Sequence, residues 1–447
     1  MAFEDMIMLL TQKRYVELKE RLSELQIPDI AEFLDELDSK NAIIAFRLLP
    51  KEIAADVFSY LSTERQGEIS MLIDEKELID IMNDLFFDDK IDFLEEMPAN
   101  VVKRILRNVS EAERRLINHF LQYPDNSAGS LMTIEFVDLK KEMTVKDALG
   151  KIRRVGRDRE IVYTCYVTDA RRKLEGIVSL KDLVLASPDA KVEDIMRKEV
   201  IYVDTYDHRE DVADIFKKYD FLAVPVVDQE KRLVGIITID DIVDVIEKEN
   251  TEDFQRIAAI QPSEIDYLES TPLMLARKRI VWLLILMISA TVSGYIIRRY
   301  QVAIEAVVAL TAFIPMLMDT GGNAGSQSSV TVIRSLALGQ LKFSDILKVI
   351  RKELQISVLV GFGLTVVNFI RIYFLEGYDL SIALTISLTL FLTIIFAKLI
   401  GGTLPMLAKK VGLDPAIMAS PLITTIVDAV SLIVYFSLAV RILHIAV

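Results

Sequence analysis

The chain has 447 residues, of which 66 are acidic and 52 basic, so its formal net charge is −14. Residues 1–125 carry −12, residues 126–272 carry −9 and residues 273–447 carry +7. The long apolar runs after residue 272 exclude a single soluble globule. The acidic remainder argues against nucleic-acid binding, and the lone Cys165 excludes a disulfide framework.

Residues 1–125 have apolar side chains at three- and four-residue spacing and no strand pattern, which predicts an all-α domain. Leu48–Glu52 and Glu96–Asn100 each contain a Pro suited to a helix start. Their recurrence predicts a helical-repeat superhelix. Asp88, Asp89 and Asp92 fall within one helical turn, and by themselves such acids are typical of a solvated face.

An internal repeat follows, because the segment 174–184 (LEGIVSLKDLV) recurs at 233–243 (LVGIITIDDIV). In both copies a β-branched run leads through Gly to a Ser or Thr and then an Asp, which is the pattern of a strand followed by a capped helix. The repeat resembles a tandem pair of cystathionine-β-synthase-type (CBS) domains. The resemblance implies an α/β fold for residues 126–190 and 191–246.

In some CBS domains these hydroxyls and carboxylates hold a nucleotide. The matching residues here are Ser179, Asp182, Thr238 and Asp241, so ATP is one candidate ligand of the pair. The alternative is that these residues only cap helices. Adjacent acids such as Asp240 favour capping, because they would repel phosphate groups.

Residues 247–272 form an acidic connector with a bend expected at Gln261-Pro262. Five apolar segments follow, each near the length that crosses a hydrocarbon core. They cover residues 280–297, 302–318, 354–375, 380–408 and 416–440. The second continues beyond Pro315 into a Gly-rich stretch, so we expect its far end to be irregular or to line a cavity.

Short loops rich in Lys and Arg set the expected orientation. Such residues precede the first span, lie between spans two and three, and recur between spans four and five at Lys409 and Lys410. These loops are expected on the cytosolic side, although Arg298 and Arg299 favour the opposite orientation. Five spans then put the acidic N-terminal part in the cytosol and Val447 outside.

Ionisable side chains within spans are costly and usually face protein, water or an ion path. Ser420, Thr424, Asp428 and Ser431 share one helical face by their spacing, and Pro421 is expected to free a backbone carbonyl one turn earlier. Such an oxygen-only lining suits a hard cation such as Mg²⁺ or Ca²⁺. The alternative is that Asp428 hydrogen-bonds within the bundle and serves packing.

Other polar residues also lie within or at the edge of the spans, among them Glu305, Asp319, Asn323 and Lys398. For Lys398, snorkelling or a structural ion pair is favoured over a substrate role. Asp319 either contributes to an ion path or caps the Gly-rich break.

The segment 315–338 with its TGGNAGSQ core, the pair Asp414-Pro415 and the run SPLITTIVD that ends at Asp428 resemble the MgtE family of magnesium channels. The resemblance extends over essentially the whole chain and implies a homodimer in membrane lipid whose second and fifth spans line one pore. It implies that Asp428 is the central Mg²⁺ site, Glu305 a pore acid near the outer mouth and Asp414 an acid at the cytoplasmic face. The family often has Asn where this chain has Ser420.

The resemblance also implies that residues 247–272 are a plug helix at the cytoplasmic mouth. Acidic faces of the N-terminal domain, the CBS pair and the plug repel one another at low Mg²⁺. Mg²⁺ that bridges their carboxylates would draw them together and close the pore. The regulatory ligands are expected among the acids of these regions and of the pore mouth: Asp88, Asp89, Asp92, Glu210, Asp220, Asp241, Asp244, Glu249, Glu252, Asp253 and Asp414.

Together these patterns predict a passive, Mg²⁺-selective channel of the cytoplasmic membrane that its own ion closes from inside. One alternative is a secondary transporter that couples divalent-cation movement to Na⁺ or H⁺, and another is a membrane-anchored sensor of adenine nucleotides. The sequence has no Gly-x-x-x-x-Gly-Lys-Ser/Thr stretch, so an ATPase is not expected. Neither an enzymatic activity nor an obligatory protein partner is predicted, and an oxygen lining does not separate Mg²⁺ from Mn²⁺, Co²⁺ and Ca²⁺.

Overall fold

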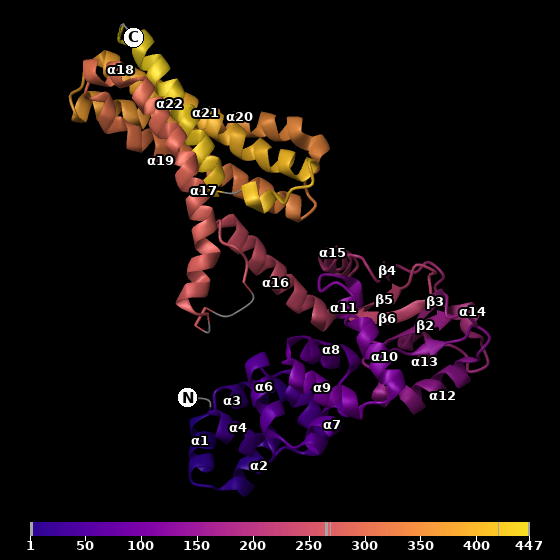
Figure 1. Cartoon of the computed structure of the whole chain (residues 1–447). Helices are drawn as coiled ribbons and strands as arrows, with labels where there is room; N and C mark the ends of the chain where they lie inside the picture. The colour runs from indigo at the N-terminus through magenta and orange to yellow at the C-terminus, as the bar shows by residue number, and fades with distance from the viewer. Residues whose placement is uncertain (1–2, 264–266, 269, 419, 446–447) are drawn as a thin grey trace. The chain divides into compact units, whose positions relative to one another are not determined.

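The computed structural model describes residues 3–263, 267–268, 270–418 and 420–445. The chain forms two compact units, Met1–Ile246 and Glu247–Val447. The first unit contains short helices followed by two small sheets, and the second is a bundle of long helices (Figure 1). This multidomain arrangement confirms the predicted fold class.

Ten short helices occupy the N-terminal part, and Pro50 and Pro98 stand at the N-caps of two of them, as the sequence predicted. Helices α3, α5, α7 and α9 stack in one row and α4, α6 and α8 in a second, which is how a helical-repeat superhelix is built. The helices are α1 Glu4–Thr11, α2 Tyr15–Glu24, α3 Ile27–Asp35, α4 Ser39–Phe46, α5 Lys51–Ser59, α6 Thr63–Leu72, α7 Glu75–Asp84, α8 Phe87–Glu96, α9 Ala99–Asn108 and α10 Glu111–Phe120.

The predicted repeat forms two three-stranded sheets of the same topology, one of β1, β2 and β3 and one of β4, β5 and β6. In each, the first strand is parallel to the second, and the second is antiparallel to the third. The strands are β1 Asp138–Leu139, β2 Thr164–Thr168, β3 Leu174–Ser179, β4 Val203–Asp204, β5 Ala223–Val227 and β6 Leu233–Thr238. The helices are α11 Ala128–Leu131, α12 Val145–Val155, α13 Leu180–Leu185, α14 Val192–Ile195, α15 Arg209–Tyr219 and α16 Ile239–Ile257.

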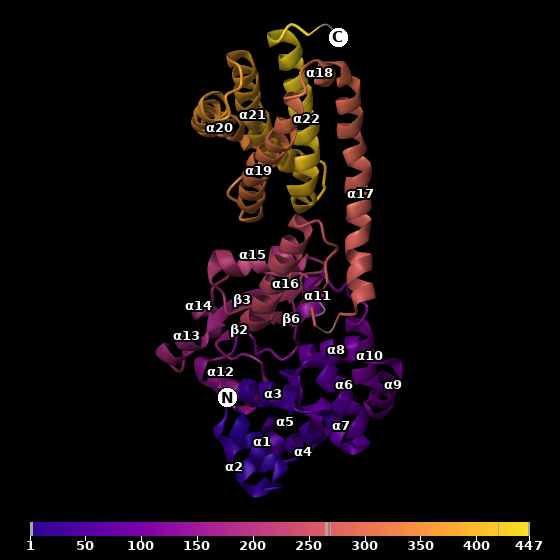
Figure 2. The same cartoon turned by 90° about the vertical axis from the view of Figure 1, so that its left-hand side faces the viewer.

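The second unit begins with the last part of α16 and continues as a bundle in which α19 packs on α21 and α22, and α20 packs on α21. Helix α17 packs against α22 and stays mostly exposed (Figure 2). The helices are α17 Pro272–Arg299, α18 Gln301–Ala306, α19 Leu310–Ala337, α20 Ile346–Ile370, α21 Leu380–Lys410 and α22 Ser420–Ile442. A π-helical turn, Arg371–Leu375, extends α20.

By length and apolar composition, four described helices are long enough to cross a membrane: 272–299, 343–375, 380–410 and 421–442. Helix α19 is as long as α17 at 28 residues, which is about 42 Å at 1.5 Å per residue. It differs in composition, because its central Gly, Ser and Asn residues lower its hydropathy. The expected fifth span is therefore a helix of spanning length with a polar middle.

The expectation that the far end of the second span is irregular was wrong. The chain forms a short helix, α18, and then α19, which runs unbroken through Pro315 and the Gly-rich stretch. Unpaired backbone groups are costly in a membrane, so the helical hydrogen bonds outweigh the low helix propensity of glycine.

The glycines of α19 instead permit close helix contact. A Cβ atom on Gly321 would lie 2.7 Å from Thr393 of α21, and one on Gly325 would lie 2.9 Å from Ile423 of α22. On the facing helix, a Cβ atom on Gly401 would overlap the carbonyl oxygen of Gly325. We call these contacts of Gly321, Gly322, Gly325 and Gly401 the glycine seam. It brings α19, α21 and α22 to the short separations typical of small-xxx-small packing.

Candidate ion-conduction site

Asp428 lies on α22 beside the glycine seam. Its Oδ1 atom is buried and has no hydrogen-bond partner within the described residues. The carboxylate of Asp319 on α19 lies near enough for the two charges to interact. A buried carboxylate oxygen without a donor is unfavourable, so this position suits a cation or its water shell.

The neighbours of Asp428 on α22 have different environments. The methyl group of Thr424 lies against Gly322, at 2.8 Å from where a Cβ atom of that glycine would be. Ser431 is buried and donates a 2.7 Å hydrogen bond to the backbone oxygen of Val427. The Ser431 hydroxyl therefore already has a partner in its own helix, which weakens the expected four-residue lining. The side chain of Ser420 lies outside the described residues.

Pro421 does not free a carbonyl, contrary to the prediction. It is the second residue of α22, where a backbone N–H would have no partner within the helix in any case. The Pro421 carbonyl itself accepts a 3.0 Å hydrogen bond from the Thr425 hydroxyl.

A polar row runs along the exposed face of α19. Asp319, Asn323 and Gln327 are spaced four residues apart and are all exposed, so they share one side of the helix. Asp319 lies well inside an unbroken helix, and the expectation that it caps a break is therefore wrong. Polar side chains on a membrane helix usually face a water-filled path or another protein.

Lys398 is buried in a hydrogen-bonded chain that joins three helices. Its Nζ atom lies 3.4 Å from the Ser328 hydroxyl, which donates a 2.6 Å hydrogen bond to a carboxylate oxygen of Glu353. All three side chains are buried. This Glu353–Ser328–Lys398 network supports a structural role for Lys398, through a bridging hydroxyl. Glu353 was not among the predicted residues, because the third span was expected to begin one residue later.

The two remaining membrane-domain candidates lie outside the long helices. Glu305 is exposed on α18, and its Oε1 atom accepts a 2.7 Å hydrogen bond from Gln301. Asp414 lies between α21 and α22, where its Oδ1 atom accepts a 2.8 Å hydrogen bond from the backbone N–H of Ala416.

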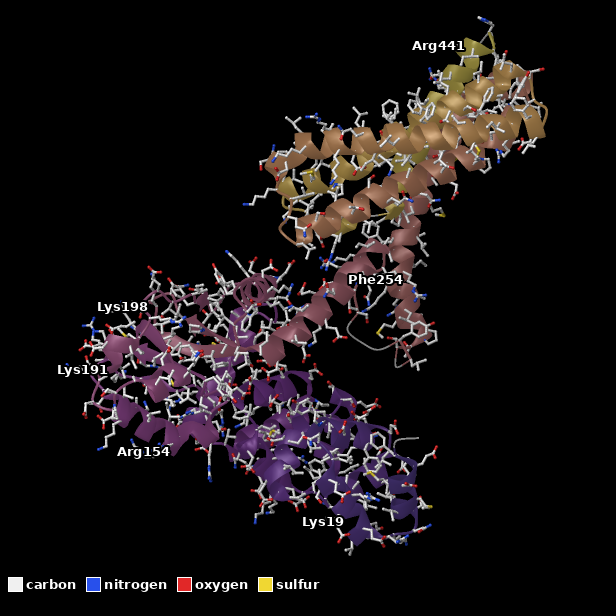
Figure 3. All side chains as sticks on the ribbon, turned by 180° about the vertical axis from the view of Figure 1, so that it is seen from behind. Lys19, Arg154, Lys191, Lys198, Phe254 and Arg441 are labelled. Atoms are coloured by element: carbon white, nitrogen blue, oxygen red, sulfur yellow. The ribbon has the colours of Figure 1, made fainter. Side chains whose placement is uncertain are left out.

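A residue that sequence reasoning missed links Asp414 to the acidic connector. The guanidinium of Arg256, on α16, donates hydrogen bonds to the carboxylates of both Asp414 and Glu252. Asp253 lies beside them, and burial followed by repulsion from Asp414 raises its pKa. The exposed Phe254 lies on the same part of α16 (Figure 3). The connector thus presents acids and one cation near the loop between α21 and α22.

In the first unit, the structure brings together acids from α8, the segment before β2 and the start of α16. Burial, then mutual repulsion, raises the pKa of Asp89 and of Asp241 to about 7 and that of Glu160 to about 8. Burial also raises the pKa of Asp88 well above its usual range. Asp88 is buried, and Asp89, Glu160 and Asp241 are half-buried. We call these four residues the buried acidic cluster. The sequence predicted three of its members but missed Glu160, which is distant in the sequence.

The other predicted regulatory acids are less concentrated. Asp92, like the neighbouring Asp240, interacts electrostatically with members of the buried acidic cluster. Glu210 is the second residue of α15, and Asp220 follows the last residue of that helix in a left-handed conformation. Asp244 and Glu249 lie along α16. No three His, Cys, Asp or Glu side chains in the described part of the chain already form a group that could hold a metal ion. A bridging ion would therefore require carboxylates to move or a second copy to contribute.

The candidate nucleotide residues are engaged in local contacts. The Ser179 hydroxyl accepts a 3.0 Å hydrogen bond from the backbone N–H of Asp182 and so caps α13. The Thr238 hydroxyl donates a 2.8 Å hydrogen bond to Asp241. These contacts support the capping alternative.

Family models match the N-terminal helical domain, the CBS pair and the helical bundle in the order described above. Residues 25–126 match the MgtE intracellular N domain, residues 128–189 and 192–248 match the CBS domain, and residues 314–438 match the divalent cation transporter model named MgtE. These matches, together with the apolar helices, place the chain in the class of membrane transporters of divalent cations.

Similarity to curated proteins identifies the family. The chain is 36% identical over 426 residues to the magnesium transporter MgtE of Thermus thermophilus and 32% identical over 431 residues to that of Bacillus subtilis. The matches cover 94% of this chain in both cases, and 94% and 95% of the two relatives. The chain belongs to the MgtE family of magnesium transporters.

A solved structure extends the similarity to the fold. The crystal structure of the soluble part of a magnesium transporter is 31% identical, with a TM-score of 0.52. It covers 55% of this chain and 97% of the other chain.

Proposed function

We propose that this transporter is a Mg²⁺-selective channel that admits the ion passively through the cytoplasmic membrane. The observation that carries the proposal is the buried Oδ1 atom of Asp428, which has no hydrogen-bond partner within the described residues. The membrane potential supplies the driving force, at ~2.3 kcal/mol per elementary charge per 100 mV.

The pore wall is formed by two copies of the chain. The exposed polar row of Asp319, Asn323 and Gln327 supports this arrangement, because a single copy leaves it uncovered in an otherwise apolar bundle. When the rows of two copies face one another, α19 and α22 enclose a polar path, and lipid covers the apolar outer faces. Glu305 then lies at one end of the path and Asp414 at the other.

Selectivity comes from carboxylates that hold a hydrated ion. Mg²⁺ loses its water reluctantly and commonly binds proteins through one or two carboxylates while keeping several waters. Two Asp428 side chains, one from each copy, supply such a site without a soft ligand. Thr424 lies one turn away and adds a hydroxyl to the same wall.

Cytosolic Mg²⁺ closes the channel by neutralising the acids outside the membrane. The buried acidic cluster supports this step, since burial and then repulsion between its carboxylates raise their pKa values. Mg²⁺ bound there, and at Glu252, Asp253 and Asp414, stabilises the compact form that blocks the path. The basic loops keep this part in the cytosol and put the C-terminus outside.

The test is patch recording from the full-length protein in liposomes with Mg²⁺ as the sole permeant cation. Discrete openings should vanish as cytoplasmic-side Mg²⁺ rises from micromolar to ~10 mM, a range that covers weak carboxylate sites. Asp428→Asn should abolish the currents or their selectivity. Asp345→Asn, which alters an acid in the loop before α20, is the matched control and should leave the currents unchanged.

A coupled transporter is the second candidate, favoured by the buried charges of Glu353 and Lys398, which could take part in ion or proton coupling. It predicts bulk Mg²⁺ uptake without unitary currents, and uptake that depends strictly on Na⁺ or H⁺. That result would contradict the channel proposal.

A further inference from the structure

A cavity of about 240 Å³ lies between the two CBS domains and has no part in the ion path described above. Residues of the first domain contribute most of its wall, and β6 of the second contributes Leu233. The lining residues are Ile134, Phe136, Asp138, Arg159, Thr168, Arg172 and Leu233.

The strand register explains how these side chains meet. Asp138 of β1 pairs with Tyr166 of β2, and residues two apart on a strand point to the same side. Phe136, Asp138, Tyr166 and Thr168 therefore share one face of the sheet. Intervening residues such as Val137 pack in the core on the opposite face, with α12 and α13.

The cavity wall carries two arginines, of which Arg159 is half-buried and Arg172 is exposed at the mouth. The Nε atom of Arg159 is buried and has no hydrogen-bond partner within the described residues. Arg172 donates one 3.1 Å hydrogen bond, to the backbone oxygen of Leu233. In the part of the chain that the structure describes, neither guanidinium forms an ion pair.

The one acid in the wall is already neutralised. Asp138 forms a 2.7 Å ion pair with Lys151, and Lys140 extends to within 2.8 Å of the Thr168 hydroxyl. With Arg159, Arg172 and Asp138 in the wall, the lining side chains carry one net positive charge. Arg154, Lys191 and Lys198 are also exposed on the CBS pair but do not line the cavity (Figure 3).

A further polar group in the same layer also has no partner. Tyr166 is fully buried, its ring contacts that of Phe136 with centroids 6.0 Å apart, and its hydroxyl makes no hydrogen bond to any described residue. Buried donors without acceptors are unfavourable. A ligand rich in acceptor oxygens would satisfy the guanidinium groups through charge-assisted hydrogen bonds.

We propose that this cavity binds a small oxyanion, namely the phosphate or carboxylate group of a small metabolite. A volume of about 240 Å³ suits a compact anion and lies below the usual range for drug-sized ligands. The site is separate from the candidate nucleotide residues, since Ser179, Asp182 and Thr238 do not contribute to the described wall. Because the wall includes both CBS domains, the bound anion also stabilises their association.

The experiment is calorimetric titration of the full-length protein in detergent with inorganic phosphate or acetate, without Mg²⁺ and at constant ionic strength. If only phosphate gives a saturable binding heat, the cavity binds a phosphoryl group. If acetate gives a saturable binding heat, the cavity binds a carboxylate. Arg159→Gln and Arg172→Gln should each weaken binding by about tenfold or more, the loss of one charge-assisted hydrogen bond. Arg157→Gln is the matched control, since Arg157 is exposed and does not line the cavity.

Thermal melting separates loss of binding from loss of folding. Without anion, Arg159→Gln should melt no lower than the unmodified protein, because it removes a half-buried cation whose Nε atom has no partner among the described residues. Added anion should no longer raise its melting temperature. If Arg159→Gln fails to fold, Arg159→Lys provides the same comparison with the charge retained. Absence of saturable binding to either probe, or equal weakening by Arg157→Gln, would overturn the proposal.

Discussion

Arg256 shows how a single side chain can serve two carboxylates from different segments. Its planar guanidinium binds Glu252, one turn earlier on α16, and Asp414 in the loop between α21 and α22. Burial alone would lower the pKa of Arg256, but the neighbouring carboxylates of Asp414 and Glu252 outweigh that effect and raise it, so the side chain stays charged. An arginine here supplies part of the positive charge that a divalent ion would otherwise provide.

Arg256→Gln should make closure more dependent on Mg²⁺. Without the guanidinium, Asp414, Glu252 and Asp253 repel one another until a cation binds, so the open probability at micromolar Mg²⁺ should rise severalfold. Millimolar Mg²⁺ should still close the channel. Single-channel recording measures both effects, and Lys248→Gln is the control because it removes an exposed positive charge from the same helix. An unchanged open probability at micromolar Mg²⁺ would show that the contact between Arg256 and Asp414 does not keep the channel closed.

At the scale of elements, the glycine seam and the buried acidic cluster have opposite effects on packing. The seam brings helix backbones together by removing side chains, whereas the cluster holds charged side chains close together where water is scarce. The glycine seam stabilises packing at any pH. The buried acidic cluster weakens packing whenever its carboxylates ionise without a bound cation.

Gly401→Ala should destabilise the membrane bundle, because its methyl group would overlap the Gly325 carbonyl oxygen. Overpacking of this kind costs ~1–3 kcal/mol or more, so the melting temperature in detergent should fall. Gly363→Ala is the matched control, since a Cβ atom there would meet no atom within 4 Å. A loss of stability in both variants would point to a general effect of helix substitution.

The first unit should lose stability as pH rises in the absence of divalent ions. Asp89, Asp241 and Glu160 have folded-state pKa values of about 7, 7 and 8, above the values near ~4 of unfolded carboxylates. Between these limits the folded state binds more protons than the unfolded state, so the free energy of unfolding falls as pH increases from about 4 to about 8.

Thermal melts of the full-length protein across that pH range test this prediction. Added Mg²⁺ should restore stability at pH 8, and Asp89→Asn should make the melting temperature depend less on pH. Asp29→Asn, at an exposed position, should leave the pH dependence of the melting temperature unchanged. A melting temperature that rises with pH would contradict the proposed role of the cluster.

At the scale of the whole molecule, the sequence supported the domain order and the fold class but not the contacts between distant segments. Asp428 could be named as a candidate because one carboxylate in an apolar helix is conspicuous, and its role as an ion site stays a prediction. Glu353 and Lys398 are 45 positions apart, and only the packing of three helices brings them to Ser328. The continuity of α19 was missed because glycine propensities measured in water do not apply where no water competes for backbone groups.

The proposed homodimer makes a prediction at the same scale. In a Cys165→Ser background, Asn323→Cys places a thiol in the exposed polar row of α19, and oxidation in membranes should yield mainly cross-linked dimer. Leu359→Cys, which is 75% exposed on α20, is the lipid-facing control and should remain mostly monomer on denaturing gels. Equal cross-linking at both positions would indicate random collision rather than a defined interface.

The glycine seam has a mechanical consequence for α19. Side chains of the facing helices, among them Thr393, Thr424 and Ile423, fit into the space that each glycine leaves, so α19 cannot slide along α21 and α22 unless these side chains change rotamer. The Glu353–Ser328–Lys398 network fixes the same axial register of α19 against α20 and α21. A movement of α19 should therefore carry α20, α21 and α22 with it, and Asp319 and Asn323 should stay at constant heights relative to Asp428.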